Sequence, residues 1–314
     1  MRIVFMGSAE IACATLTMLM EWPAVTVVGV VAQPDRRVGR KLQLAPCPAK
    51  EHAAALGVEI FTPERVNTPD AIAHIQSWVP DVGVVMAYGQ ILRPTLLSVP
   101  RLGFLNIHTS LLPRYRGAAP IQRAIANGDA KTGVSVMQMD AGMDTGDVLA
   151  MASTGIGESE TAGELHNRLS VMGADLMKAV LINLMAGSAV RQPQSDRGIT
   201  YAPRLEKQEG QIDWTQPARC LYNQVRGFNP WPCCYCRFDA GKSGVQVLRV
   251  LEARCLSGGY GLPGEILGDR NGCFVVACGE GALELVLVQA QGKSVMDGKA
   301  FLQGRRLVPG TVLG

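Results

Sequence analysis

The chain opens with Arg2-Ile-Val-Phe-Met6, a short apolar run that ends at Gly7. A second apolar run, Thr26-Val-Val-Gly-Val-Val-Ala32, is rich in β-branched residues, and residues 9–20 carry apolar side chains at helical spacing. A strand that is apolar throughout is buried on both faces, which is typical of a parallel sheet covered by helices. These residues therefore predict an α/β fold that begins with a strand, a helix and a parallel strand.

The alternation of apolar runs and helical patterns continues along the first half of the chain. Ligands of such sheets bind at the carboxyl ends of the strands. The turn Gly7-Ser-Ala-Glu-Ile-Ala12 has one glycine where a dinucleotide fingerprint needs three, so the fold class by itself predicts no nucleotide cofactor. Further strands are predicted over 58–61, 82–87, 104–108 and 134–137, and further helices over 49–56, 70–79 and 163–186.

The composition is that of a globular protein, and 314 residues are enough for two domains. The charged fraction of 18% and the net charge of +3 argue against a disordered or coiled-coil chain. No apolar stretch reaches the length of about 20 residues that a membrane-spanning helix needs, and the apolar start is too short for a signal peptide. We therefore expect a cytoplasmic protein without membrane contact.

After Trp214 the pattern changes to short strands separated by glycine-rich turns. A small closed barrel is favoured for this part, because closure removes unpaired sheet edges. The strands that the alternation predicts here lie over 245–250, 273–277 and 283–289.

A linker is predicted between the two parts. Residues 189–208 are small and polar, contain Pro193 and Pro203, and show no steady period. The predicted domains are therefore an α/β domain over 1–188 and a β-barrel domain over 209–314, joined by this linker.

The nine cysteines are odd in number and irregular in spacing, and a chain of this size does not need disulfides. The cluster Cys233-Cys234-Tyr235-Cys236 invites a metal site. Zinc usually takes paired ligands with a second pair elsewhere, however, and no second pair is present. The favoured interpretation is half-buried strand cysteines that behave as small hydrophobic side chains.

Asn106 and His108 are the first candidate catalytic residues. They are two positions apart in a predicted strand, so their side chains share one face. An amide beside an imidazole can bind a developing oxyanion and transfer a proton. A structural pair at a strand end is the alternative. The other three histidines lie in helical patterns, whereas His108 lies where a parallel sheet binds ligands.

An acidic turn follows the predicted strand 134–137 and reads Gln138-Met-Asp-Ala-Gly-Met-Asp-Thr-Gly-Asp147. One carboxylate near His108 would raise its basicity and hold its tautomer. Turn chemistry alone also favours acidic residues at such positions. The sequence leaves open whether Asp140, Asp144 or Asp147 would be the carboxylate partner of His108.

Together these motifs resemble the 10-formyltetrahydrofolate-dependent formyltransferases. The resemblance rests on Asn106-x-His108, on Ser110-Leu-Leu-Pro-x-Tyr-Arg-Gly117 directly after it, and on Asp144-Thr-Gly-Asp147 about 30 residues further on. It covers essentially the whole chain and is strongest to the members that formylate methionyl initiator tRNA. The segments that indicate these members are Gln33–Arg36, Val85–Gly89, Arg116–Arg123 and Phe228–Pro232.

The resemblance implies a Rossmann-like catalytic domain and an OB-like, tRNA-binding barrel domain. It also implies transfer of the formyl group of 10-formyltetrahydrofolate, a co-substrate, to methionyl initiator tRNA, by a monomer that needs no metal. Asn106 and protonated His108 would stabilise the tetrahedral oxyanion, and Asp144 would orient His108 or a water that relays the proton. The resemblance further implies a folate pocket formed by Ser110, Leu111, Leu112 and Pro113, with Met86 and Tyr88 on its other wall.

A basic loop is predicted after the second strand, where four cations stand against Asp35. A charged loop is usually only solvated, but this one follows a strand end near the expected site and could reach tRNA phosphates. The resemblance implies that the loop contacts the acceptor arm, most directly through Arg40. The four predicted tRNA-binding residues are Arg36, Arg37, Arg40 and Lys41.

The charge of the C-terminal part gives little support for nucleic-acid binding. From residue 209 onward, 11 Lys and Arg stand against 9 Asp and Glu. A basic surface would require the cations to gather on one face, with Arg226, Lys242, Arg249, Arg305 and Arg306 as the candidates.

Two other classes of function compete with a tRNA enzyme. A formyltransferase acting on an amino-sugar nucleotide or a purine precursor would carry the same motifs at 103–117 and 144–147. The basic loop and the barrel favour tRNA over these substrates. A non-catalytic folate- or RNA-binding module is the third possibility, and the intact set of Asn106, His108 and Asp144 argues against it.

Overall fold

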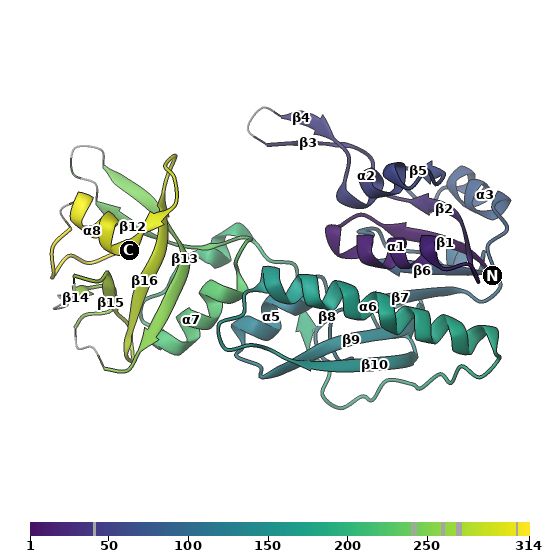
Figure 1. The fold of residues 1–314 in the computed structure, drawn as a ribbon. Coiled ribbons are helices and arrows are strands. Elements are labelled where there is room, and N and C mark those ends of the chain that lie inside the picture. The colour runs from purple at the N-terminus through teal and green to yellow at the C-terminus, as the bar shows by residue number, and fades with distance from the viewer. Residues whose placement is uncertain (40–41, 240, 242–243, 259–260, 268–271, 306) are drawn as a thin grey trace. The chain divides into compact units, whose positions relative to one another are not determined.

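The computed structural model describes residues 1–314 except 40–41, 240, 242–243, 259–260, 268–271 and 306. The contacts of the described residues divide the chain into two compact units, whose elements are labelled in Figure 1. The first unit comprises Met1–Ala118, Lys131–Gly155 and His166–Ala202, and the second comprises Ala119–Ala130, Ile156–Leu165 and Pro203–Gly314.

Each unit consists of three separate segments of the chain, whereas the sequence predicts two continuous domains over 1–188 and 209–314. Two inner segments belong with the C-terminal residues. The first contains α5 (Pro120–Ala126), which packs on α7 (Ala218–Gly227), and the second is bonded to α7 through Arg226, which donates to the carbonyl oxygens of Gly157 and Glu160. The approach of these two helices is close. A Cβ added at Gly227 would lie 3.1 Å from the carbonyl oxygen of Gln122.

The first unit is built around a seven-stranded sheet in the order β10-β9-β7-β6-β1-β2-β5. The five strands from β7 to β5 are parallel, whereas β9 runs antiparallel to β7 and β10 antiparallel to β9. The parallel part confirms the predicted α/β fold. The strands are β1 (Arg2–Gly7), β2 (Thr26–Val31), β5 (Ile60–Phe61), β6 (Val82–Met86), β7 (Phe104–His108), β9 (Lys131–Gln138) and β10 (Val148–Gly155).

Helices cover both faces of this sheet, and for this reason its central strands are apolar on both sides. On one face, Thr15 donates its hydroxyl to Sδ of Met86 and Ser170 donates to the carbonyl oxygen of Ile11. On the other face Ile75 packs with residues of β1 and β6. The helices are α1 (Cys13–Glu21), preceded by a 3₁₀ turn over Glu10–Ala12, α2 (Pro48–Ala55), α3 (Pro69–Ser77), α4 (Pro94–Leu97) and α6 (Ala162–Met185).

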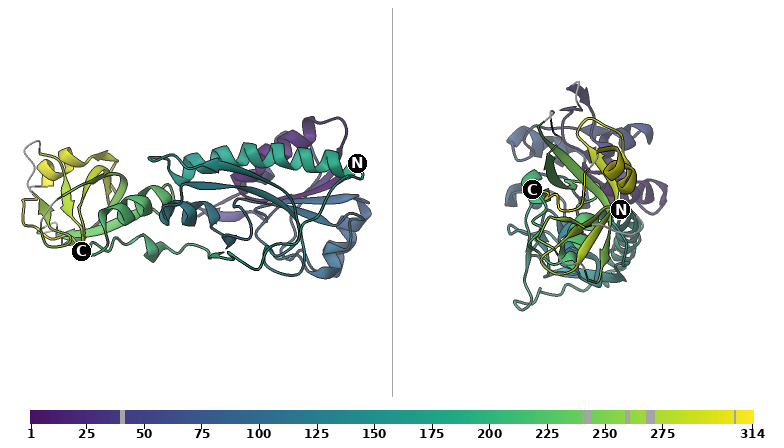
Figure 2. Two further views of the ribbon diagram at one scale, coloured as in Figure 1. Left: turned by 90° about the horizontal axis from the view of Figure 1, so that it is seen from below. Right: turned by 90° about the vertical axis from the view of Figure 1, so that its left-hand side faces the viewer.

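The long helix α6 matches the predicted helix over 163–186 to within one residue at each end. Figure 2 shows it running along the sheet. None of the helices formed by the described residues is long and apolar enough to cross a membrane.

Two segments that the sequence predicts as loop or linker hold additional strands. The basic loop is a two-stranded hairpin of β3 (Arg36–Val38) and β4 (Gln43–Ala45). The predicted linker contains β11 (Tyr201–Ala202), which pairs in parallel with β8 (Arg116–Gly117). Both pairs consist of only two or three residues per strand, so their side chains show no alternation long enough to predict them.

The second unit is built around an antiparallel sheet with β12, β13, β16, β15 and β14 in that order, and β17 beside β16. Residues 311–314 join its two ends. Leu313 donates its N–H to the carbonyl oxygen of Gly264, beside β14, and Gly314 donates to that of Arg237 in β12. This double pairing closes the sheet and confirms the predicted barrel. The elements are β12 (Cys234–Asp239), β13 (Val245–Leu256), β14 (Ile266–Leu267), β15 (Val275–Ala277), β16 (Ala282–Ala290), β17 (Met296–Asp297), α8 (Gly298–Arg305) and a 3₁₀ turn over Lys207–Gly210.

The cysteine cluster supplies part of the core of this unit. Cys234 and Cys236 alternate with partly exposed Tyr235 on β12, and both thiols are fully buried among apolar side chains. The prediction of strand cysteines is therefore confirmed for Cys234 and Cys236, although they are buried more deeply than expected. It is wrong for Cys233, which precedes β12 and has a positive φ of 67°. Burial raises the pKa of Cys234 well above its usual range and that of Cys236 to about 12.

These environments predict strongly different thiol reactivities. Cys220 and Cys255 are exposed, so they should react with a thiol reagent within minutes. Cys234 and Cys236 should remain unmodified until the protein unfolds, because the reactive thiolate is both inaccessible and disfavoured. Alkylation of the native protein followed by peptide mass spectrometry measures both groups. Rapid modification of Cys236 in the folded protein would contradict this view of the core.

Candidate active site

The parallel strands end together at one edge of the seven-stranded sheet, and a single side chain connects three of these ends. Ser8, directly after β1, donates its hydroxyl to the carbonyl oxygen of Tyr88, 2.9 Å away. The hydroxyl oxygen of Ser8 also accepts the backbone N–H of Gln33 at 3.1 Å. Ser8 thus joins the residues that follow β1, β2 and β6. This is the edge at which the sequence predicts ligand binding.

His108 is the last residue of β7 and is 6% exposed. Its Nε2 lies 2.9 Å from the carbonyl oxygen of Tyr115. Because a carbonyl oxygen only accepts, Nε2 carries a proton and donates it. Its Nδ1 lies 3.6 Å from Oδ2 of Asp144, which is longer than a hydrogen bond. The ring is therefore anchored through Nε2, and Nδ1 is the nitrogen left to exchange a proton.

Of the three acidic residues that the sequence left open, the structure brings Asp144 to His108. Oδ2 of Asp144 accepts the backbone N–H of Gly117 at 2.8 Å, and the residue has a positive φ of 54°. Asp140 has a different role. Its carboxylate accepts the hydroxyl of Thr145 at 2.7 Å within the turn itself. The turn-forming acid and the acid beside the imidazole are thus separate residues of one loop.

Asn106 lies two residues before His108 on β7, on the same face of the strand. It is partly exposed, whereas the other four residues of β7 are buried. Its amide is thus accessible at the edge where His108 ends the strand. The structure therefore brings together the three predicted catalytic residues, two from β7 and one from the loop after β9.

The residues predicted to line a folate pocket fall into two groups. In the first, Ser110 is buried and its hydroxyl donates to the carbonyl oxygen of Arg114 at 2.6 Å. The segment is fastened to β9 through Ser135, whose hydroxyl donates to the carbonyl oxygen of Ser110 and accepts the N–H of Leu112. Leu112 is buried, while Leu111 and Pro113 are partly exposed. This turn can thus present a fixed, partly apolar surface.

The second group consists of Met86 and Tyr88, whose side chains belong to the core. Met86 is 1% exposed and lies against Thr15. Tyr88 is 2% exposed, and among the described residues its hydroxyl has no hydrogen-bond partner. Burial raises the pKa of Tyr88 well above its usual range. In this conformation neither side chain offers an exposed surface to the expected site.

Several neighbours of the predicted catalytic residues could not be predicted from the sequence. The carbonyl of Tyr115 and the N–H of Gly117 are backbone groups, for which sequence carries no signal. Gln194 bonds to the backbone of the Asp144 loop, and Thr200 bonds to the backbone of Tyr115. Both belong to the segment 189–208 that the sequence predicts as a linker.

Two of the four predicted tRNA-binding residues lie on the β3–β4 hairpin. Arg36 and Arg37 are exposed on β3, and Arg36 donates to the side chain of Gln33 at 3.2 Å. Asp35 forms an ion pair with Lys50 at 2.5 Å, so it does not neutralise these arginines directly. Arg40 and Lys41 lie outside the described residues.

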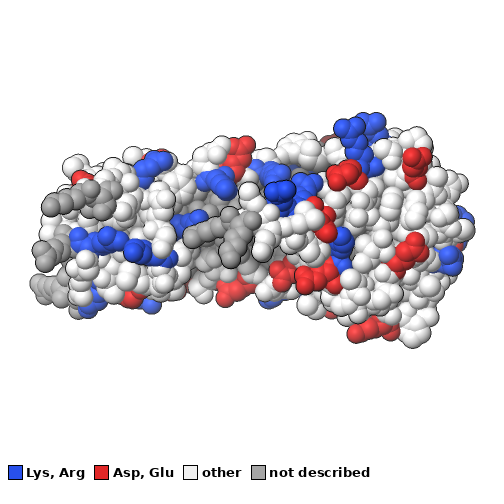
Figure 3. Space-filling view, turned by 90° about the horizontal axis from the view of Figure 1, so that it is seen from above, with Lys and Arg blue, Asp and Glu red and all other residues white. Residues whose placement is uncertain are grey.

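The basic residues proposed for a face of the second unit do not all reach solvent. Arg226 is buried, and its guanidinium donates to the carbonyl oxygens of Gly157 and Glu160. It therefore has a structural role, and its inclusion in a basic surface is wrong. Lys242 and Arg306 lie outside the described residues. On the face shown in Figure 3, the coloured side chains of the left-hand part are mostly basic, whereas basic and acidic side chains are interspersed on the right-hand part.

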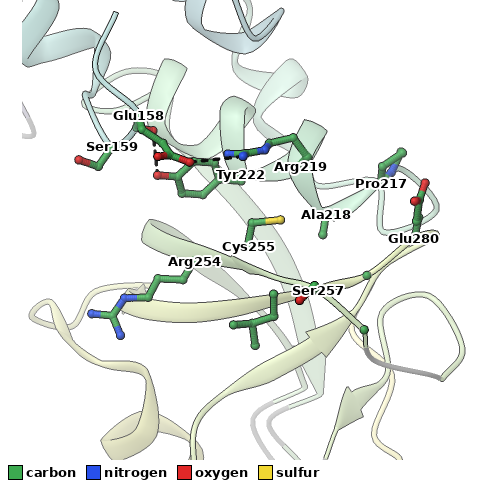
Figure 4. A pocket seen from close by; sticks show the side chains of 13 residues that line it. Glu158, Ser159, Pro217, Ala218, Arg219, Tyr222, Arg254, Cys255, Ser257 and Glu280 are labelled. Atoms are coloured by element: carbon green, nitrogen blue, oxygen red, sulfur yellow. Dashed lines mark hydrogen bonds and ion pairs between the residues drawn. The ribbon is translucent and has the colours of Figure 1, made fainter.

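A cavity of about 770 Å³ lies in the second unit between α7 and β13. Figure 4 shows Arg219 directed towards Glu158, with which it forms an ion pair at 3.4 Å, and Cys255 between the helix and the strand. Arg254 and Glu280 add one further charge of each sign to the lining. With its charges balanced, this cavity has no marked preference for an anion or a cation, and it contains none of the predicted site residues.

No three His, Cys, Asp or Glu side chains in the described part of the chain gather in a way that could hold a metal ion.

Comparison with known proteins gives matches over both units. The family model for formyl transferase matches residues 1–181, and that for the formyl transferase C-terminal domain matches residues 204–306. A protein from Geobacter metallireducens named methionyl-tRNA formyltransferase is 44% identical over 315 residues, which cover 100% of this chain and 99% of that protein.

Solved structures share the fold at lower identity. WlaRD, described as a sugar 3N-formyl transferase in the presence of dTDP and 5-N-formyl-THF, has a TM-score of 0.66 and 17% identity, covering 94% of this chain and 99% of its own. HypX from Aquifex aeolicus in complex with tetrahydrofolic acid has a TM-score of 0.62 and 17% identity over 98% of this chain and 48% of its own. This chain thus spans about half the length of HypX.

The family matches extend from the parallel sheet to the barrel, and relatives share more than 40% of their residues from end to end. Taken with the His108 site at the end of the parallel strands, they show that this chain belongs to the formyl transferase family.

Proposed function

We propose that this formyltransferase transfers the formyl group of 10-formyltetrahydrofolate to the α-amino group of methionyl initiator tRNA, for the initiation of translation. The observation that carries the proposal is the arrangement of His108. It is held by the carbonyl of Tyr115 and faces the carboxylate of Asp144, beside the accessible amide of Asn106. Full-length relatives at more than 40% identity carry the corresponding name.

The geometry gives each residue a part in the reaction. The amine nitrogen attacks the formyl carbon, and the C=O electron pair moves to the oxygen. The amide N–H of Asn106 and the Nδ1 side of protonated His108 stabilise this oxyanion. The attacking nitrogen loses a proton, directly or through a water, to Nδ1 of His108, and the ring protonated in this way, its charge offset by Asp144, is the one that faces the oxyanion. The same proton passes to N10 as the bond between N10 and the formyl carbon breaks. The products are formyl-methionyl-tRNA and tetrahydrofolate.

The proposed donor pocket lies beside this group. The fixed turn from Ser110 to Pro113 offers partly exposed Leu111 and Pro113 as apolar walls for a pterin ring. Met86 and Tyr88, predicted as the other wall, have buried side chains, so we do not propose that these side chains contact the donor.

The proposed tRNA contacts come from the β3–β4 hairpin and from the C-terminal residues 209–314. A hairpin with exposed arginines can hold its cations against phosphates, and Arg36 and Arg37 are exposed on β3. The same proposal extends to Arg40 and Lys41, which lie outside the described residues. We propose that the chain acts in the cytoplasm and as a monomer.

The test is transfer of labelled formyl from 10-formyltetrahydrofolate to methionyl initiator tRNA, with methionyl elongator tRNA as the control. We expect strong transfer to the initiator and little to the elongator. Transfer to neither, by a folded protein that still binds the folate, would contradict the proposal. Donor turnover with an amino-sugar nucleotide in the absence of RNA would then indicate the alternative class of formyltransferase.

Substitution of a hairpin arginine should change the KM for tRNA and leave the KM for the formyl donor unchanged. We expect Arg37→Glu to raise the KM for tRNA roughly 10-fold at low salt, because it replaces one phosphate contact with repulsion. The slope of log KM against log salt concentration should fall by about one for the same reason. Arg93→Glu is the matched control, since Arg93 is also exposed on the first unit. Equal increases in the KM of tRNA and donor would show that the hairpin is structural.

A further inference from the structure

We propose that Gln194 and Thr200 are positioning residues for His108, so that the segment 189–208 is a part of the active site and not merely a linker. This inference rests on the proposed catalytic role of His108. The two side chains act on different partners of the imidazole. Gln194 holds the loop that carries Asp144, and Thr200 holds the backbone of Tyr115.

Both the nitrogen and the oxygen of the Gln194 side-chain amide form hydrogen bonds. Its Nε2 donates to the carbonyl oxygens of Asp144 and Gly146, both at 2.8 Å. Its Oε1 accepts from Nε and a terminal nitrogen of Arg116, at 3.2 and 2.8 Å. The orientation of the amide is fixed by chemistry, because a carbonyl can only accept and a guanidinium can only donate. Gln194 therefore fastens the Asp144 loop to the residue before Gly117.

This fastening fixes the position of the Asp144 carboxylate from two sides. Its backbone oxygen is held by Gln194, and its Oδ2 is held by the N–H of Gly117. Gly117 has a φ of 120°, and an added Cβ would lie 2.7 Å from the carbonyl oxygen of Ala202. A side chain at position 117 would therefore clash with the backbone of β11 unless one of the two strands moved. The carboxylate is thereby kept 3.6 Å from Nδ1 of His108.

Thr200 acts on the other side of the ring. Its hydroxyl accepts the backbone N–H of Tyr115 at 2.8 Å, and its carbonyl oxygen accepts the N–H of Arg116 at 2.9 Å. Tyr115 has a positive φ of 58°, a conformation that is costly for a residue with a side chain and needs support from its surroundings. The supported residue is the one whose carbonyl accepts from Nε2 of His108.

Both nitrogens of His108 therefore face groups that the segment 194–200 holds in place. Tyr115 sets the tautomer and the ring orientation, and Asp144 sets the environment of Nδ1. Loss of either support should displace the ring from its productive position without removing any substrate contact. A misplacement of about 1 Å in such a site can cost roughly 100-fold in rate. The effect should thus appear in kcat and not in the KM for tRNA.

Four variants test the proposal. Thr200→Val is nearly isosteric and removes the acceptor for Tyr115, whereas Thr200→Ser retains the hydroxyl. Gln194→Glu retains the acceptor for Arg116 and removes both donors to the Asp144 loop. Gln192→Glu is the matched control, because Gln192 is exposed in the same segment and pairs with Val148 through its backbone.

We expect Thr200→Val and Gln194→Glu to lower kcat roughly 10- to 100-fold, with the KM for tRNA changed less than about threefold. Thr200→Ser should recover most of the lost kcat, and Gln192→Glu should behave as the wild type. Unchanged kcat in both of the first two variants would overturn the proposal. A loss of kcat that follows a loss of folded protein, measured by thermal melting, would overturn it as well, because the role would then be structural.

A spectroscopic measurement does not depend on transfer activity. The chain has only four histidines, so the ring nitrogens can be resolved by ¹⁵N NMR. The wild type should show His108 with a protonated Nε2, and Thr200→Val should show a mixture of tautomers. If the wild type formylates no methionyl-tRNA but this change is seen, the proposed function fails and the positioning role stands. If the tautomer is unchanged in Thr200→Val, the positioning role of Thr200 fails.

Discussion

Replacement of His108 by alanine should lower kcat for formyl transfer by about 10³-fold or more, equivalent to about 4 kcal/mol of transition-state stabilisation. The variant removes both the proton acceptor and one stabilising group for the oxyanion. The substrates bind through other residues, so the KM values for tRNA and donor should change much less. Steady-state kinetics with varied concentrations of each substrate separates the two effects.

The control for this variant is His166→Ala. His166 is partly exposed on α6, where its Nδ1 lies 3.1 Å from the side chain of Asn167. Its removal should leave kcat within about twofold, as for an ordinary surface substitution. Retention of full activity by His108→Ala would contradict the mechanism. An equal loss in both variants would show that the assay measures stability and not catalysis.

Much of the scaffold could be predicted from the sequence, because burial on both faces leaves a distinctive pattern. β1 and β6 consist almost entirely of buried residues, and a short apolar run between turn residues is typical of a central parallel strand. That the C-terminal part forms a β-barrel could be predicted from the alternation of apolar and polar residues in its strands. Its closure by residues 311–314 could not, because Leu313 and Gly314 pair through backbone groups that any sequence would offer.

The candidate site could be predicted only where side chains carry the chemistry. Asn106 and His108 were identifiable because their spacing puts both on one face of a strand. The choice of Asp144 over its neighbours needed the resemblance to a family, since Asp140 occurs in the same turn. In the structure the distinction comes from the N–H of Gly117, which lies 27 positions away and contributes nothing to the local pattern of the turn.

Gln194 is the clearest example of a site residue that the sequence could not identify. Its partners Asp144 and Arg116 lie 50 and 78 positions earlier in the chain. The local composition around it is that of a linker, because proline and small polar residues also suit an extended segment that crosses a surface. Only tertiary contacts reveal that such a segment supports a catalytic loop.

Asp144→Asn should separate the charge of this residue from its position. The amide retains an oxygen for the N–H of Gly117, so the loop should keep its conformation. It cannot offset the positive charge that His108 acquires during the reaction. We expect kcat to fall by about 10²- to 10⁴-fold, the range found when a group that supports a catalytic histidine loses its charge. Thermal melting should show little change.

Asp140→Asn is the matched control, because it removes the same charge from the same turn. The carboxylate of Asp140 bonds to Thr145 and Gly142, and an amide oxygen can accept both of these bonds. Its kcat should stay within about threefold of the wild type, the range of a surface substitution. Equal losses in the two variants would mean that the charge of the loop matters and not its contact with Nδ1. A loss confined to Asp144→Asn would show that the required negative charge is the one on Asp144. Its Oδ2 lies 3.6 Å from Nδ1 of His108, where the proposed proton transfer needs a negative charge.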